Sequence, residues 1–312
     1  TNLYGSMTMT PGNGYRIRGP QSFSNEERAI FEGVFKGIPN NGNISVTGLL
    51  SGKYYAVGNP YPSTINVAAF YTENPNAGTL YFWRKTNGAA GSAYVTFSGG
   101  SFSDGPHTNN TIQPGQGFIV QATNAADLTF NNTQRNANNG VFYRNGNATE
   151  SEDSSRIWLN LKSNDLVIGQ MAVGYRAEAT NSIDADFDAE YINDSALALN
   201  SIVEGTELAV QHRAPFTATD VVPLSFKTTT AGTFVIAINE VDGLFTNAEQ
   251  NIYLKDNFTN TIHDIKQSAY TFATQDGTFN NRFEVVYSNS VLGNDDFVNE
   301  NAITVYTNQN SI

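Results

Sequence analysis

The sequence predicts an all-β protein made of two β-sandwich domains, of the jelly-roll or immunoglobulin-like type, with few short helices. Through most apolar segments, apolar and polar residues alternate with a period of two, which is the pattern of strands with one buried face. Turn signals rich in Asn, Asp and Gly separate segments spaced roughly 8–12 residues apart, as in sandwiches. The 312 residues include 20 Phe and 15 Tyr, enough to fill a sizeable core.

The period-two pattern predicts the strands one by one. At 156–161, for example, Ile157, Leu159 and Leu161 fall on one face of an extended chain. In chain order, strands are expected at 43–50, 53–57, 79–85, 93–98, 117–122, 127–131, 156–161, 207–212, 233–239 and 282–287. Asn-Gly and Asp-Gly pairs between them, such as Asn41-Gly42, supply the left-handed backbone that tight turns need.

Helical signals are few and short. Residues 24–28 favour one turn, residues 63–71 a short helix after Pro62, and residues 194–201 a third. None of them is longer than two or three turns, so helices cannot form a layer of the fold.

The expected domain boundaries follow polar stretches. Residues 145–155 are acidic and contain no large apolar residue, as expected of a linker. The expected domains are therefore 1–147, N-terminally incomplete, and 155–290. Residues 291–312 would be a further linker and one strand at 302–306, which needs a sheet to pair with.

Composition excludes several classes of protein. The net charge of −12 argues against a nucleic-acid partner, because a phosphate-binding surface needs a basic excess. The absence of cysteine rules out disulfides, zinc–thiolate sites and thiol nucleophiles. No run of 18 apolar residues occurs, so direct membrane insertion as a helix is not expected.

The sequence does not predict an enzyme. The common hydrolase, zinc-protease and nucleotide-binding motifs are missing. His107, His212 and His263 have no spacing that suggests shared metal ligation, and each is interpreted as a surface or hydrogen-bonded residue. No catalytic residue and no organic cofactor is therefore expected.

A candidate calcium site is formed by Asp184, Asp186 and Asp188. Alternate carboxylates in a loop can direct several oxygens at one hard cation. The loop does not match an EF-hand, because Ala189 stands where the sharp turn needs Gly and Ser195 where a bidentate Glu is needed. The alternative is an acidic loop whose carboxylates are solvated or hydrogen-bonded to the chain.

A candidate glycan site is formed by Tyr61 and Trp83. Tyr61 lies in the rigid motif Gly58-Asn59-Pro60-Tyr61-Pro62-Ser63, and both aromatic rings are of the kind that stack on sugars. The alternative reading of Tyr61 is a buried aromatic at a rigid corner between a strand and a helix.

Several stretches together resemble a known family. They are residues 9–17 (MTPGNGYRI), 57–63 (VGNPYPS), 112–120 (IQPGQGFIV), 156–161 (RIWLNL), 184–188 (DADFD), 252–256 (IYLKD) and 281–284 (NRFE). Their order and spacing are similar to the C-terminal region of large, adhesin-like surface proteins of Bacteroidota that the type IX secretion system exports. Residues 295–312 resemble the first strand of the C-terminal sorting domain of these proteins.

The resemblance implies a secreted protein at the bacterial cell surface, at the outer membrane. Its partners would be the type IX translocon and outer-membrane shuttle proteins, reached through the sorting domain. Asp194-Ser195-Ala196 matches the O-glycosylation pattern of this group of bacteria, with Ser195 as acceptor. The expected function is a non-enzymatic stalk of a surface-anchored adhesin; the alternative is a carbohydrate-binding module of a polysaccharide-degrading enzyme.

Overall fold

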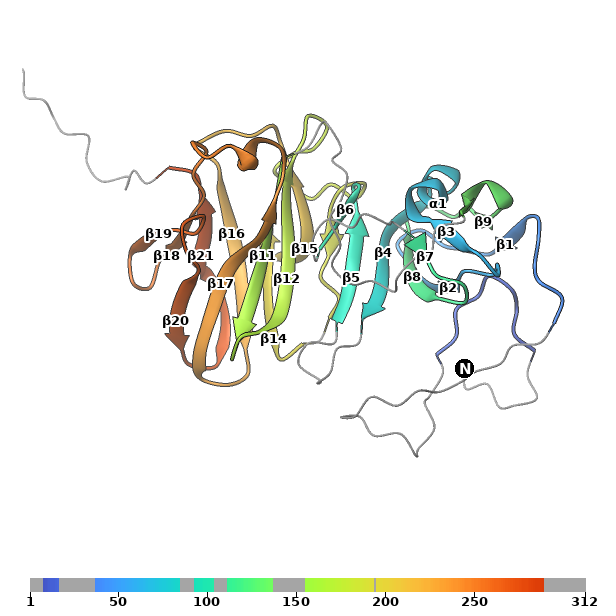
Figure 1. Ribbon diagram of the computed structural model, residues 1–312, viewed down its shortest axis with the longest axis horizontal. Helices are drawn as coiled ribbons and strands as arrows, with labels where there is room; N and C mark the ends of the chain where they lie inside the picture. Colours follow the sequence, from blue (N-terminus) through green and yellow to red (C-terminus); the bar gives the residue numbers. More distant parts are fainter. Residues whose placement is uncertain are drawn as a thin grey trace, which may run out of the picture.

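The computed structural model describes residues 8–16, 37–84, 93–103, 111–136, 155–193 and 195–288. The protein is mostly β, which confirms the predicted class at that level. One large sheet is built from residues 155 and later, and smaller sheets are built from residues up to 136 (Figure 1).

The main sheet of the N-terminal region has the strand order β2-β8-β4-β5-β6, with neighbours antiparallel. Its strands are β2 (Tyr54–Gly58), β8 (Gly117–Ala122), β4 (Ala77–Arg84), β5 (Ala93–Ser98) and β6 (Ser101–Phe102). Every second residue of β4 is directed to the same side, so Leu80 and Phe82 face a core while Tyr81 and Trp83 face outward.

Short elements cover the inner face of this sheet. They are β1 (Ile44–Val46) paired with β9 (Leu128–Phe130), the ladder β10 (Arg135–Asn136), β3 (Thr64–Asn66) and β7 (Thr111–Ile112), helix α1 (Val67–Glu73) and the 3-10 turn η2 (Asn132–Gln134). Helix α1 begins later than predicted because Asn66 caps it by accepting a hydrogen bond from the Ala69 N–H. Its Phe70 is fully buried against Phe118 and Phe130.

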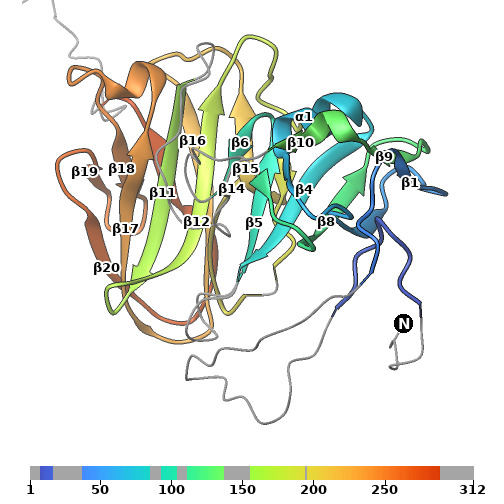
Figure 2. The same cartoon turned by 45° about the vertical axis from the view of Figure 1, so that its right-hand side comes forward.

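The large sheet curls almost into a barrel (Figure 2). Its order is β19-β18-β21-β16-β14-β15-β12-β11-β17-β20, with β13 beside β15. The strands are β11 (Ser155–Ser163), β12 (Leu166–Tyr175), β13 (Ala189–Glu190), β14 (Leu197–Val203), β15 (Thr206–Arg213), β16 (Val221–Thr228), β17 (Gly232–Val241), β18 (Tyr253–Asp256), β19 (Thr261–Asp264), β20 (Tyr270–Thr274) and β21 (Gly277–Val286). The 3-10 turn η3 (Gly243–Thr246) follows β17. Strands β12 and β15 are parallel neighbours, which the long connection between them allows.

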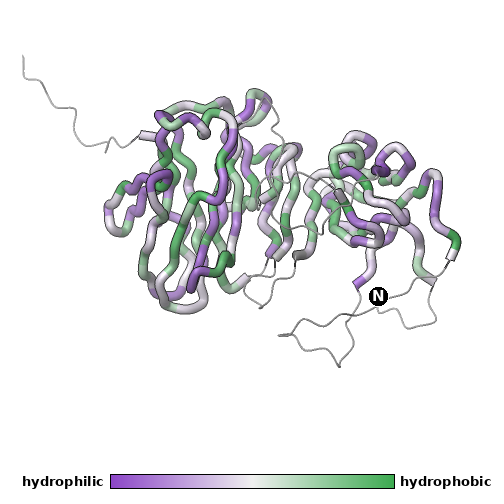
Figure 3. Tube along the Cα trace, in the orientation of Figure 1, coloured by the Kyte–Doolittle hydropathy of each residue, from purple (hydrophilic) through white to green (hydrophobic). Residues whose placement is uncertain are grey.

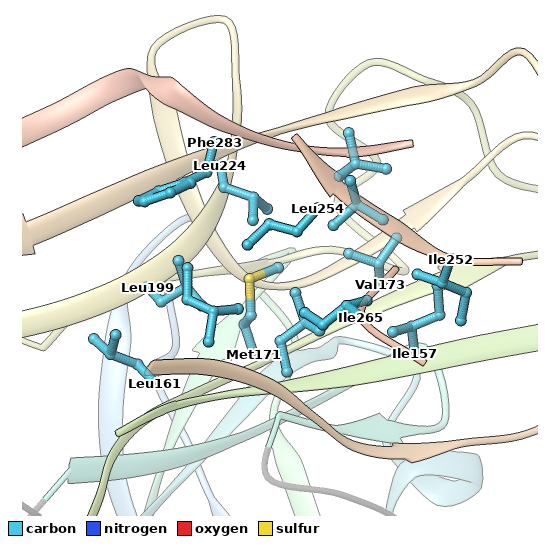
Figure 4. Packing of buried hydrophobic residues seen from close by; sticks show 14 of the residues in the cluster. Ile157, Leu161, Met171, Val173, Leu199, Leu224, Ile252, Leu254, Ile265 and Phe283 are labelled. Atoms are coloured by element: carbon cyan, nitrogen blue, oxygen red, sulfur yellow. The ribbon is translucent and has the colours of Figure 1, made fainter. Parts of the chain in front are cut away.

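Aliphatic and aromatic side chains fill the inside of the curled sheet (Figure 4). Ile157, Leu159 and Leu161 of β11 meet Leu224 of β16 and Phe283 of β21 there. The alternating hydropathy along these strands can be followed in Figure 3. This cluster draws only on residues 157–287, and the N-terminal cluster only on residues 46–130, so the described chain has two main hydrophobic cores.

One predicted element is wrong. The sequence predicts a short helix over residues 194–201, but 197–201 form most of strand β14. Leu199 is directed into the core and pairs with Phe226 of β16, so burial between neighbouring strands overrides the local helical preference. The expected helix at 24–28 and the strand at 302–306 lie outside the described residues. So does the expected linker at 145–155, except for Ser155, which is the first residue of β11.

The two ends of the described chain lie far apart (Figure 1). Residues 8–16 lie with the small sheets at one end of the long axis, and the last residues of β21 lie at the other end. The N-terminal sheet stands beside the large sheet, with β5 and β6 facing β13 and β15.

A buried ion pair stabilises the large sheet near the β18–β19 turn. The Arg282 guanidinium donates to Asp256 at 3.0 Å between Nη2 and Oδ2, and both side chains are almost completely buried. The guanidinium also lies within 5.1 Å of the ring centroids of Phe258, Phe272 and Phe283.

Arg282→Ala should lower the free energy of unfolding by about 3–5 kcal/mol, because it leaves the Asp256 carboxylate buried without its partner. Urea denaturation followed by tryptophan fluorescence measures the loss. Lys255→Ala is the matched control, since Lys255 pairs with Glu284 in a half-exposed ion pair, and it should cost less than about 1 kcal/mol. Equal losses in the two variants would contradict the assignment.

Candidate functional site

Within the described residues, polar and titratable side chains gather where the N-terminal sheet meets the large sheet. We call this contact the seam. It comprises Tyr81, Ser98, Gly99, Ser101 and Phe102 on one side and Arg156, Trp158, Asp188, Glu190 and His212 on the other.

Trp158 anchors the seam. It projects from β11 on the face opposite Ile157 and Leu159, and its indole N–H donates to the Phe102 carbonyl at 2.7 Å. The ring is 1 % exposed and packs with Ala172, Ala189 and Val210 in a small apolar cluster. A buried indole with its one donor satisfied contributes both apolar area and direction to the contact.

Arg156, two residues earlier on the same face of β11, extends the contact. Its guanidinium is paired with Asp242 and donates to the Ser101 hydroxyl at 3.2 Å. It also stacks on the Trp158 ring at 5.1 Å from the ring centroid. Because Arg156 and Asp242 are both largely buried, their charges compensate each other inside the contact.

His212 lies in a slot between two glycines. Its Nδ1 is 2.8 Å from the Phe187 carbonyl and its Nε2 is 3.1 Å from the Ser101 hydroxyl. A carbonyl can only accept, so Nδ1 carries the proton and Nε2 accepts from Ser101. A Cβ at Gly99 or Gly174 would stand 2.9 or 2.7 Å from the imidazole, so both positions require glycine for space.

Burial sets the charges of the two titratable groups in this part of the seam. Burial lowers the pKa of His212 to about 4, and the neighbouring Arg176 and Arg156 add to the effect, so the imidazole is neutral near pH 7. Burial raises the pKa of Asp188 to about 6. The Asp188 carboxylate accepts the backbone N–H groups of His212 at 2.7 Å and of Asp184 at 2.8 Å.

The pairing of Ser101 with His212 resembles an activated nucleophile, in which an imidazole accepts a hydroxyl proton. The two residues are 2 % and 1 % exposed, however, and Gly99 and Gly174 close over the imidazole. A substrate cannot reach the hydroxyl while the seam is formed. The pair therefore joins the two regions as a satisfied buried hydrogen bond.

The chain from 188 to 193 lies across the outward face of the N-terminal sheet. The Ser98 and Thr79 hydroxyls donate to the Asp188 carbonyl, and the Tyr81 hydroxyl donates to the Glu190 carbonyl at 3.3 Å. Hydroxyl groups of the N-terminal sheet thus satisfy backbone carbonyls at and next to the short strand β13.

The three Asp residues of the predicted calcium site have different environments. Asp184 accepts the Thr180 N–H at 2.6 Å and the Thr180 hydroxyl, Asp186 is exposed, and Asp188 is buried in the seam. Among the described residues, no group of three acidic or histidine side chains is arranged to hold a metal ion. The geometry of Asp184 and Asp188 matches the alternative of an acidic loop bonded to its own backbone.

The two residues of the predicted glycan site, Tyr61 and Trp83, differ in exposure and lie in different surroundings. Tyr61 is 2 % exposed, donates its hydroxyl to the Gly42 carbonyl and lies under Arg135, as expected of a buried corner. Trp83 is 54 % exposed and meets Tyr94 edge to face, with 5.0 Å between ring centroids. The structure does not bring Tyr61 and Trp83 into one binding face.

Ser195, the predicted acceptor of an O-glycan, is half-buried. It lines a cavity of about 20 Å³ together with Tyr94, Gln170 and Tyr191, which is room for about one water molecule. Asp194, the first residue of the glycosylation pattern, lies outside the described residues.

The sequence does not predict the seam, and it indicates His212 only as a surface or hydrogen-bonded residue without naming its partners, Ser101 and the Phe187 carbonyl. One signal was present: Arg156 and Trp158 alternate with the core residues Ile157 and Leu159, so β11 has a large aromatic side chain on its supposedly solvated face. A tryptophan there indicates that a second surface covers the strand.

A family model described as a domain of unknown function (DUF8693) matches residues 2–287. The match includes both sheet regions and the seam between them. No curated protein matches the chain significantly, and no solved structure does so either. No helix in the described part of the chain is long and apolar enough to cross a membrane.

The seam predicts two opposite pH effects. The stability that neutral His212 contributes is complete above about pH 6.5 and is lost as the pH falls toward its folded pKa of about 4. The contribution of protonated Asp188 is complete below about pH 4 and is lost as the pH rises through its folded pKa of about 6. Between about pH 4 and pH 6, the contribution of His212 to the free energy of unfolding therefore rises with pH while that of Asp188 falls.

Urea denaturation between pH 4 and pH 6.5 separates the two effects. Relative to the unchanged protein, Asp188→Asn should lose stability as the pH falls across this range, and His212→Gln should gain it. Asp186→Asn, at an exposed position, is the control and should give a profile parallel to that of the unchanged protein. Parallel profiles for all three variants would contradict the buried assignment.

Proposed function

The chain belongs to the family described as a domain of unknown function (DUF8693), and we propose that it is the non-enzymatic stalk of a secreted, surface-anchored adhesin. Its work is mechanical: it holds an adhesive region at a distance from the cell surface and transmits tension between the two. The single observation that carries this proposal is the seam, in which buried groups from both regions are fully engaged with each other.

The seam supports a stalk because a spacer must not bend at its joint. Trp158 and Arg156 reach from β11 to backbone and hydroxyl groups of β6, and His212 fits between glycines that belong to different regions. A joint of this kind has the burial and packing of a domain core, in contrast to the mobile contacts usual between domains. The matched family model includes both sides of the joint.

The placement of the two ends also supports a stalk. The small sheets lie at one end of the long axis and the end of β21 at the other, so the chain advances along that axis (Figure 1). In this proposal the two regions are β-sandwich domains, 1–147 and 155–290. The proposed layers of the second sandwich are β12-β11-β17-β20 and β14-β16-β21-β18, each of which is a run of neighbouring strands in the large sheet.

The export route and location of the stalk come from the sequence resemblance. The chain is exported by a type IX translocon, engages outer-membrane shuttle proteins through the adjoining sorting segment and works outside the cell. The lack of cysteine and the charge of −12 suit a soluble module next to an anionic envelope.

The alternative, a carbohydrate-binding module, has less support. Such a module uses coplanar exposed rings, whereas Tyr61 and Tyr81 are buried and Tyr54 is tilted by 54° against Tyr81. The exposed Trp83 has Tyr94 as a ring neighbour, but their planes are inclined by 67°, so this pair is not coplanar either.

Rigidity can be measured with two introduced spin labels. The chain has no cysteine, so Lys53→Cys and Asp276→Cys give unique labels on the two regions. Pulsed electron spin resonance should give one narrow distance distribution. Trp158→Phe, which removes the donor to Phe102, should broaden it, because the joint loses its central hydrogen bond.

Trp83→Phe is the matched control, since it changes the exposed tryptophan and should leave the distribution narrow. A broad distribution in the unchanged protein would contradict a stiff spacer. A glycan array provides the functional counterpart: binding of a polysaccharide at millimolar ligand, lost in Trp83→Ala, would favour the carbohydrate-binding module.

A further inference from the structure

The chain enters and leaves the large sheet at the same pole. Strand β11 begins there at Ser155, and β21 ends there at Val286 beside the starts of β16 and β18. Each of these two strands has neighbours on both sides, β12 and β17 for β11, and β16 and β18 for β21. Although β11 begins and β21 ends at the same pole, the strands β16, β14, β15 and β12 lie between them in the order of the sheet.

Four aromatic rings fill this pole. Tyr175, Phe216, Phe245 and Tyr287 make contacts in every pairing, with ring centroids 4.9–5.8 Å apart and mostly edge-to-face geometry. They come from the end of β12, the loop after β15, turn η3 and the residue after β21. We call them the aromatic clamp.

Hydrogen bonds lock the clamp. The Tyr175 and Tyr287 hydroxyls are hydrogen-bonded at 2.7 Å, and the Tyr175 hydroxyl donates to Asp220 at 2.8 Å. Asp220 is held in turn by a two-pronged ion pair with Arg213, the last residue of β15. Burial raises the pKa of both Tyr175 and Tyr287, so both hydroxyls keep their protons.

The clamp is tied directly to the point where the chain enters the sheet. Tyr175 is the register partner of Ser155, and the Leu244 N–H, next to Phe245, donates to the Ser155 hydroxyl at 2.9 Å. The next residue, Arg156, bonds to Asp242 at the start of η3 and to Ser101 across the seam. The seam, the start of β11 and the clamp are therefore consecutive contacts.

We propose that the aromatic clamp is a tension clamp, which carries pulling force from the seam to the C-terminal end of β21 without passing it through the sheet. Without the clamp, a force that pulls β11 and β21 from the same pole would pass through β16, β14, β15 and β12, and would break the hydrogen bonds between neighbouring strands one at a time. The Tyr175–Tyr287 contact joins the end of β21 to the end of β12, and Tyr175 pairs with Ser155 at the start of β11, so these contacts share the force.

This inference rests on the proposed stalk, because only a protein under tension needs such a device. The clamp differs from ordinary core packing in one measurable respect: it resists force along one axis. Tyr287→Phe removes one hydroxyl and leaves the ring packing intact, so the variant should fold.

Single-molecule force spectroscopy on the full chain provides the test. The native axis uses handles at Thr8→Cys and Ser288→Cys. The opposite-pole axis uses Leu166→Cys at the start of β12 and Asp276→Cys just before the start of β21. Because each strand has 10 residues, both handles are about 30 Å from the clamp at the other end of these strands. Tyr287→Phe should shorten the lifetime at constant force about tenfold on the native axis, and less than twofold on the other.

Tyr270→Phe is the matched control. Its hydroxyl donates to Asp256 at 3.0 Å, outside the clamp, and its loss should change the native-axis lifetime less than twofold. Equal shortening of the lifetime on both axes by Tyr287→Phe would overturn the clamp and leave the stalk untouched. An early extension step in the unchanged protein, in which the seam opens before the large sheet unfolds, would contradict the stalk. In that case the effect of Tyr287→Phe on the lifetime of the later step, the unfolding of the large sheet, tests the clamp.

Discussion

Strand β11 is buried on both of its faces, and the organisation of the protein depends on that constraint. Ile157 and Leu159 point into the core of the large sheet, while Arg156 and Trp158 point into the seam. Because side chains alternate strictly along a strand, one stretch of backbone serves two interfaces, and a slip of one residue would exchange the two sets. The core and the joint between the regions are therefore fixed by the same register.

Local pattern was sufficient for much of the β architecture. Strand β8 alternates cleanly between buried and less buried residues. Strands β4 and β17 have longer apolar runs, but Phe234 and Ile236 of β17 still mark its buried face at a spacing of two. Strand β12 was not predicted, because it is buried on both sides over much of its length and contains Gly169 and Gly174, so its pattern does not alternate. The sequence predicts a helix where strand β14 forms, because short apolar runs are ambiguous until a partner such as Phe226 is known.

The candidate site was much harder to predict than the fold. Ser101 and His212 are separated by 111 positions. Gly99 after β5 and Gly174 near the end of β12 are required because the imidazole lies against them, and the sequence does not show that contact. The acidic run at 184–188 suggested a cation, whereas Asp188 is used to hold the backbone of β15. Contacts between distant segments leave no spacing in a single sequence, and the outward tryptophan of β11 was the one local sign of them.

The slot around His212 limits how this family can diverge. Residues 99 and 174 come from different regions of the chain, yet neither position has room for a single methyl group beside the ring. A relative that acquires a side chain at either position must also replace the imidazole. An exposed position such as Gly37 carries no such restriction, because an added Cβ would meet nothing within 4 Å there.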